Sequence, residues 1–95
     1  MRWLESIRLN TSPADADHLA GLLQETVQTL SETKGMLDAS VYVNAEYGGD
    51  LTVLLHWETE FHDPGGSSVG QRISHALRGQ GIVSHSVWLV RKESD

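Results

Sequence analysis

The residues of this sequence best suited to chemistry are a carboxylate and an imidazole, Glu5 and His85, near opposite ends of the chain. A carboxylate beside an imidazole fixes the tautomer and the orientation of the ring, which is how a general base is built. Both residues fall on the same face of their predicted strands, and those strands are expected to be neighbours. We therefore predict that Glu5 and His85 are catalytic. The alternative is a structural pair, partly solvated near the ends of the sheet, because the strand register cannot be derived from the sequence.

Two tryptophans, Trp3 and Trp57, are predicted to lie on that same face. Two indole rings can form the walls of a pocket and hold a flat aromatic ligand by stacking. We predict that they bind such a ligand. The alternative is that they are the largest members of a small core, because aromatic side chains contribute much of the buried area in any core.

Imidazoles and carboxylates alternate where the third strand ends, at His56, Glu58, Glu60 and His62. If the strand continued through all four, they would point one way and could ligate a divalent metal ion. Solvation at a sheet edge, or polar contacts across a dimer, explains this spacing better. We therefore predict that the chain has no metal site.

The elements that must position these residues follow the order β-α-β-β-α-β. Alternating apolar residues predict strands, and the helices are indicated by apolar stripes and by capping residues. Strands are predicted at 2–9, 39–45, 51–58 and 82–92, and a frayed tail at 93–95. One helix is predicted from 13 to about 34, and a second is capped by Ser67 or Ser68 and ended by Gly79 and Gly81.

The ends of the helices are indicated by particular residues. Ser12 is a good N-cap for the first helix, followed by Pro13 at the first helical position and by Asp15 three residues after the cap. Gly35 is predicted to end that helix. Gly70 lies inside the second helix, where glycine costs about 1 kcal/mol unless the backbone must pack closely.

This order predicts a single α+β domain over residues 1–95 with a ferredoxin-like βαββαβ fold, in which a four-stranded antiparallel sheet carries two helices on one face. The face under the helices is predicted to carry Ile7, Val41, Val43, Val53, Leu55, Val83, Val87 and Leu89. The opposite face mixes polar residues with Tyr42, Leu54 and Trp88, which is too apolar to remain bare in water. We predict that this face forms a homodimer.

Composition restricts the function further. The chain has 95 residues, no cysteine and a net charge of −6. Disulfides and thiolate chemistry are therefore excluded, and the negative charge argues against nucleic-acid binding. No apolar run approaches 18 residues, and the first residues lack the apolar stretch of a signal peptide. We expect a cytoplasmic protein that does not enter membranes.

The order of elements, together with the stretch VLLHWET at positions 53–59, resembles the dimeric α+β-barrel superfamily, and most closely its antibiotic-biosynthesis-monooxygenase branch. In that branch an apolar strand ends in a Trp, followed by a charged residue and a small hydroxyl residue. The resemblance implies a dimeric α+β barrel. It also implies oxidation of a small aromatic substrate by O₂ without a cofactor, or a ligand-binding or structural dimer without catalysis.

Other members of the superfamily degrade haem with an Asn, a Trp and a His. Trp57 matches the Trp, but Ile7 stands where those relatives carry the Asn. His75 lies on the second helix, about 150° from its apolar stripe, and is expected to face water. Because of these departures we expect no haem chemistry, and we predict that this chain uses no cofactor.

Overall fold

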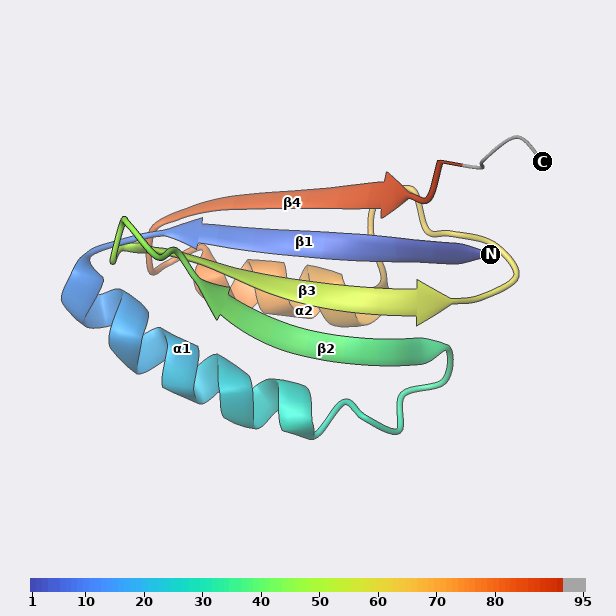
Figure 1. The fold of residues 1–95 in the computed structure, drawn as a ribbon, viewed down its shortest axis with the longest axis horizontal. Coiled ribbons are helices and arrows are strands. Elements are labelled where there is room, and N and C mark those ends of the chain that lie inside the picture. The colour runs from blue at the N-terminus through green and yellow to red at the C-terminus, as the bar shows by residue number, and fades with distance from the viewer. Residues whose placement is uncertain (92–95) are drawn as a thin grey trace.

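A computed structural model describes residues 1–91 of the chain. The last strand ends at Leu89, so its predicted continuation through residues 90 and 91 was wrong, whereas Lys92 and the predicted tail at 93–95 lie outside the described residues. Six elements follow the predicted order (Figure 1). They are β1 (Arg2–Asn10), α1 (Pro13–Gln28), β2 (Met36–Val43), β3 (Asp50–Glu58), α2 (Ser68–Leu77) and β4 (Ile82–Leu89).

The four strands form one antiparallel sheet in the order β2-β3-β1-β4, which confirms the ferredoxin-like topology (Figure 1). Helix α1 contacts β2 and β3, whereas α2 contacts β1 and β4. Of the two central strands, β3 therefore lies beneath α1 and β1 lies beneath α2. The last strand, β4, is an edge strand that pairs with β1 alone.

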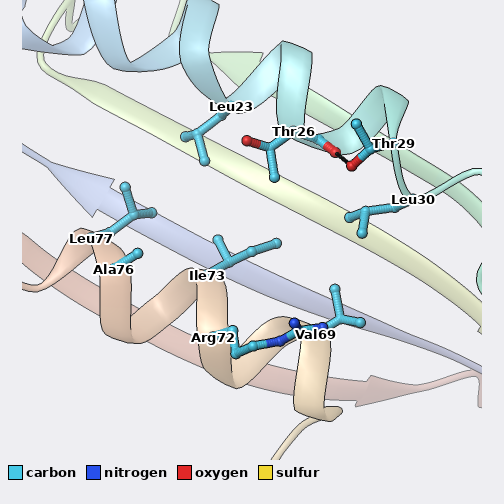
Figure 2. A pocket seen from close by; sticks show the side chains of 9 residues that line it. All are labelled: Leu23, Thr26, Thr29, Leu30, Val69, Arg72, Ile73, Ala76 and Leu77. Atoms are coloured by element: carbon cyan, nitrogen blue, oxygen red, sulfur yellow. Dashed lines mark hydrogen bonds between the residues drawn. The ribbon is translucent and has the colours of Figure 1, made fainter.

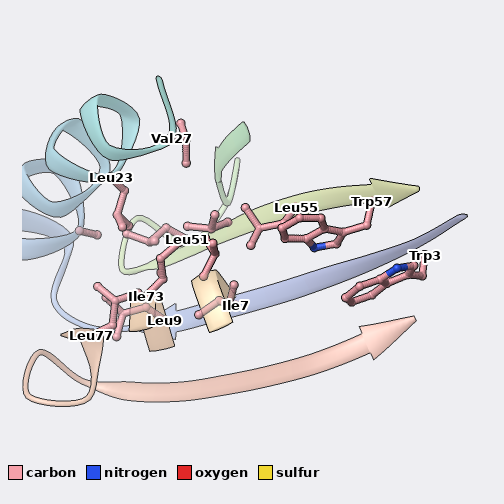
Figure 3. Close-up of a cluster of buried hydrophobic side chains, with 13 residues drawn as sticks. Trp3, Ile7, Leu9, Leu23, Val27, Leu51, Leu55, Trp57, Ile73 and Leu77 are labelled. Atoms are coloured by element: carbon pink, nitrogen blue, oxygen red, sulfur yellow. The ribbon is translucent and has the colours of Figure 1, made fainter. Parts of the chain in front are cut away.

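The core lies between the sheet and the two helices (Figure 3). Alternate residues of β1 and β3 point into it, and both helices contribute residues at helical spacing. Its buried apolar members are Trp3, Ile7, Leu9, Ala16, Leu23, Val27, Leu51, Val53, Leu55, Trp57, Val69, Ile73 and Leu77. On β1 this alternation is interrupted by one charged residue, Glu5, which is equally buried.

Both helices begin where the sequence predicted. Ser12 caps α1 by accepting a hydrogen bond from the backbone N–H of Asp15, and Ser67 caps α2 by accepting one from Gly70. The predicted end of α1 was wrong, because the helix stops at Gln28 instead of continuing to about residue 34. From Thr29 onward the backbone N–H groups bond three residues back, so the chain tightens into successive turns.

This early end shifts the following strand. β2 covers residues 36–43 instead of the predicted 39–45. Gly35 does not cap the helix but precedes β2 with a φ of +85°, and its carbonyl accepts a hydrogen bond from the backbone of Glu58. Val43 and Leu89 were predicted to be covered by the helices, yet they are 61% and 50% exposed. Each is the last residue of an edge strand.

The face of the sheet away from the helices carries an ion pair that joins β1 to the start of β3. Arg8 donates two hydrogen bonds to Asp50, Nε to Oδ1 at 2.8 Å and Nη2 to Oδ2 at 2.6 Å. Asn44 donates a third to Oδ2. The hydrogen bonds and the charge of Arg8 hold the pKa of Asp50 below its ordinary value, against the opposing effect of burial.

None of the helices in residues 1–91 has the length and apolarity that a membrane crossing requires.

This ion pair makes stability depend on pH. Because the pKa of Asp50 is lower in the folded chain than in the unfolded chain, the pair stabilises the fold above the unfolded value. That contribution is lost as the pH falls through the folded pKa. We expect Asp50→Asn to lower the melting temperature near neutral pH, and its difference from the native chain to shrink on acidification. Asp63→Asn, in an exposed loop, is the control, and an equal loss at every pH would contradict the prediction.

Candidate functional site

The carboxylate of Glu5 is completely buried, with 0% of its surface exposed, and both of its oxygens are engaged. The Nε1–H group of Trp57 donates to Oε1 at 2.9 Å, and the Nε2–H group of His85 donates to Oε2 at 2.7 Å. In the register of β1 with β4, Glu5 lies opposite Val87 and His85 opposite Ile7. Glu5 and His85 are therefore diagonal neighbours on one face, and the structure brings together the pair that the sequence singled out.

Two glycines at the start of α2 allow the helix to approach this pair. A Cβ atom at Gly70 would lie 2.0 Å from Oε2 of Glu5. At Gly66, which has a φ of +91°, a Cβ atom would lie 2.4 Å from Cε1 of His85. Side chains at either position would collide with the pair. The structure therefore contains the close backbone packing that explains a glycine at position 70, inside a helix. The part played by Gly66 was not anticipated.

His85 connects the buried carboxylate to the surface. Its Nε2 atom bonds to Glu5, whereas Nδ1 has no hydrogen-bond partner among residues 1–91. Because no buried side-chain nitrogen within those residues lacks a partner, Nδ1 is accessible to solvent. His85 borders an open groove of about 610 Å³ between α2 and β4. We call it the α2–β4 groove, and its other lining residues include Ser68, Gln71, Ser74, His75 and Arg78.

This arrangement can accept a proton from a molecule in the groove. The carboxylate holds His85 in the tautomer with hydrogen on Nε2, so that Nδ1 presents its lone pair. Deprotonation of a bound hydroxyl would place a positive charge on the imidazole next to a buried negative charge. The geometry is that of a general base with an orienting carboxylate.

The two tryptophans lie next to each other in the core. Trp3 and Trp57 are both buried, and their rings stack on each other with centroids 5.6 Å apart (Figure 3). Trp3 donates its N–H group to the hydroxyl of Thr59 at 2.8 Å. The bond from Trp57 to Glu5 was not predicted, because a side-chain contact that depends on strand register leaves no local signal in the sequence.

The alternating imidazoles and carboxylates after β3 do not stay in line. The strand ends at Glu58, and His62 approaches the edge of the Trp3 ring instead of extending the row. Within residues 1–91 no cluster of three His, Asp or Glu residues could hold a metal ion. His75 is exposed on α2, as its helical angle predicted.

A second cavity lies between the two helices (Figure 2). It measures about 320 Å³ and is mostly apolar, with Leu23 on α1 and Leu30 in the turn after it facing Val69 and Ile73 on α2. Arg72 borders both this cleft and the α2–β4 groove. An apolar cavity therefore borders one side of α2, and a polar groove borders another.

Comparison with solved structures agrees with this fold. A protein from Deinococcus radiodurans, provisionally described as an antibiotic biosynthesis monooxygenase, superposes with a TM-score of 0.72. The match covers 98% of this chain and 96% of that chain at 18% identity. The Rv0793 protein of Mycobacterium tuberculosis superposes with a TM-score of 0.69 over the whole of both chains, also at 18% identity. No protein-family model matches the sequence, and no curated protein matches it significantly. At this identity the likeness establishes the fold.

The contact between α2 and Glu5 can be tested with two alanine substitutions. Gly70→Ala should lower the free energy of unfolding by about 1–3 kcal/mol, because the added methyl group overpacks against the carboxylate. Gly21→Ala is the matched control, because it lies in α1 with nothing within 4 Å of its Cβ position. That change should stabilise the chain by up to about 1 kcal/mol. Equal effects of the two substitutions, measured by urea unfolding, would show that Gly70 has no special role.

Proposed function

We propose that this chain is a cofactor-independent monooxygenase that oxidises a small aromatic substrate with O₂. The observation that carries the proposal is the Glu5–His85 pair, because its free Nδ1 atom opens onto a groove large enough for a small molecule. The fold adds support, since a solved structure with the same topology is provisionally described as an antibiotic biosynthesis monooxygenase.

In this proposal His85 acts first. Its Nδ1 atom accepts the proton of a phenolic hydroxyl held in the α2–β4 groove, and the buried carboxylate of Glu5 stabilises the charge that the imidazole gains. The resulting phenolate is more electron-rich than the phenol and reduces O₂ more readily. Glu5 touches no substrate, so it is a positioning residue in this reaction.

The overall reaction balances without an external reductant. A ring methylene activated by the phenolate loses four electrons to O₂ and becomes a carbonyl. One oxygen atom enters the carbonyl, and the other leaves as water with the two methylene hydrogens. No flavin, haem or metal is required for this stoichiometry.

The tryptophans support the base in this proposal. Trp57 fixes Oε1 of Glu5, which leaves Oε2 directed at His85. Trp3 stacks on Trp57 and holds that indole ring in place. Their contribution to ligand binding is therefore indirect, through the orientation of the carboxylate and the imidazole.

The alternative is a ligand-binding or structural dimer without catalysis. The close packing around Glu5 favours it, because a fully buried carboxylate with two donors is also what a stable core requires. The two functions differ in whether the pair turns over a substrate.

Oxygen uptake with a hydroxyanthrone distinguishes the two. This probe has a phenolic hydroxyl and a ring methylene, so the native chain should consume one O₂ for each anthraquinone formed. Glu5→Gln and His85→Gln should lower kcat/KM by similar factors, because the two residues act as one unit. His18→Gln, on the surface of α1, is the control. Uptake no faster than in buffer, or equal in all four chains, would leave the non-catalytic function.

The proposal includes a cytoplasmic protein and a homodimer, the latter because the sheet face away from the helices mixes polar residues with exposed apolar ones. Tyr42 and Trp88 are 52% and 57% exposed there, and Leu54 lies half-buried between the neighbouring strands. The N–H group of Trp88 already bonds to Ser86 at 2.9 Å, so the ring can be buried without an unpaired donor. A second copy packed sheet to sheet about a two-fold axis would cover this face.

Substitution of the exposed tryptophan tests the dimer. Trp88→Glu should shift the chain from dimer to monomer in sedimentation velocity at micromolar concentration, because it places a charge in a desolvated interface. Phe61→Glu is the control, since that exposed aromatic residue lies in the loop after β3. A native chain that sediments as a monomer would disprove the interface.

A further inference from the structure

Charge is distributed unevenly along this acidic chain. Between positions 64 and 92 there is no Asp or Glu, although the stretch contains Arg72, Arg78, Arg91 and Lys92. Residues 1–63 carry eleven of the 13 acidic side chains. A basic segment within a chain of net charge −6 marks a place where negative charge is attracted, because the rest of the surface repels it.

Both walls of a groove come from this segment. Helix α2 and strand β4 both come from it, and the α2–β4 groove lies between them. Ser68, Gln71, His75 and Arg78 follow each other at spacings of three and four residues, so they form one stripe along the helix. His85 faces that stripe from the strand.

The two arginines at this groove, on α2 and at its C-terminal cap, differ from the two on β1. Arg2 is bonded to Glu58 and Arg8 to Asp50. Arg72 and Arg78 make no ion pair with any residue of the described part of the chain. Their guanidinium groups therefore keep their donors for a ligand. A planar guanidinium group binds a carboxylate through two parallel hydrogen bonds.

We propose that the α2–β4 groove binds a small aromatic carboxylate, with Arg78 and Arg72 holding the carboxylate. The volume of about 610 Å³ is in the range of small-molecule sites. Arg72 also borders the apolar cleft between the helices, so the carboxylate would lie where apolar surface for a ring is close by. The inference names the substrate class of the proposed oxygenase, and it rests on the proposed function only for the claim that the bound acid reacts.

Binding in the absence of oxygen tests the groove without turnover. The probes are 1-hydroxy-2-naphthoate and its neutral amide, 1-hydroxy-2-naphthamide, titrated into the native chain by calorimetry under nitrogen. The acid should bind about tenfold more tightly than the amide, because its charge is matched by an arginine. Equal affinity of the two probes, or no binding of the acid at millimolar concentration, would overturn the inference.

Three substitutions locate the charge. Arg78→Gln and Arg72→Gln should each weaken binding of the acid by about tenfold and leave the amide unchanged. Lys34→Gln removes the same charge just before β2 and should have no effect. If Lys34→Gln weakens binding as much, the acid responds to net charge and the groove is not its site. Oxygen uptake on the uncharged hydroxyanthrone is measured separately, so failure of the groove and failure of the oxygenase are distinguishable.

Discussion

The buried carboxylate of Glu5 is the constraint around which this fold is arranged. A charge removed from water must be paired and hydrogen-bonded, and removing one partner of such a pair typically costs about 3–5 kcal/mol. The chain meets this requirement with two N–H donors, from Trp57 on β3 and His85 on β4. Gly70 of α2 packs against Oε2 of this carboxylate. One side chain on β1 therefore determines what three other elements present at that point.

The position of β4 explains how a buried group can take part in surface chemistry. An edge strand has one neighbour, so its inward side chains lie close to the boundary between core and solvent. His85 occupies that boundary, with 16% of its side chain exposed, one nitrogen on the carboxylate and the other accessible. A residue that points toward the helices from a central strand is fully buried, as Leu55 and Ile7 are. The imidazole ring of His85 thus connects the buried carboxylate of Glu5 to the solvent-accessible α2–β4 groove.

Much of the fold was predictable, because local rules govern it. The alternation of β1 and β3 indicated the buried face, and the candidate caps, Ser12 for α1 and Ser67 or Ser68 for α2, indicated where the helices begin. The end of α1 was not predictable, because the residues after Gln28 form turns that a helical pattern does not distinguish. The contact of Glu5 with His85 was suggested by their shared face, but the bond from Trp57 depends on strand register and side-chain rotamers. Those are set by packing of the whole core, which no single segment encodes.

The two glycines over the carboxylate also carry information beyond this chain. Gly66 and Gly70 are four residues apart, and each is required by the same pair of side chains on β1 and β4. In a diverging lineage, loss of the acid at position 5 would remove the steric reason for Gly70, and loss of both the acid and His85 would remove the collision at position 66. Covariation among positions 5, 66, 70 and 85 would therefore reveal which descendants of this fold keep the buried pair. Overall sequence identity would not distinguish the descendants that keep the pair from those that have lost it.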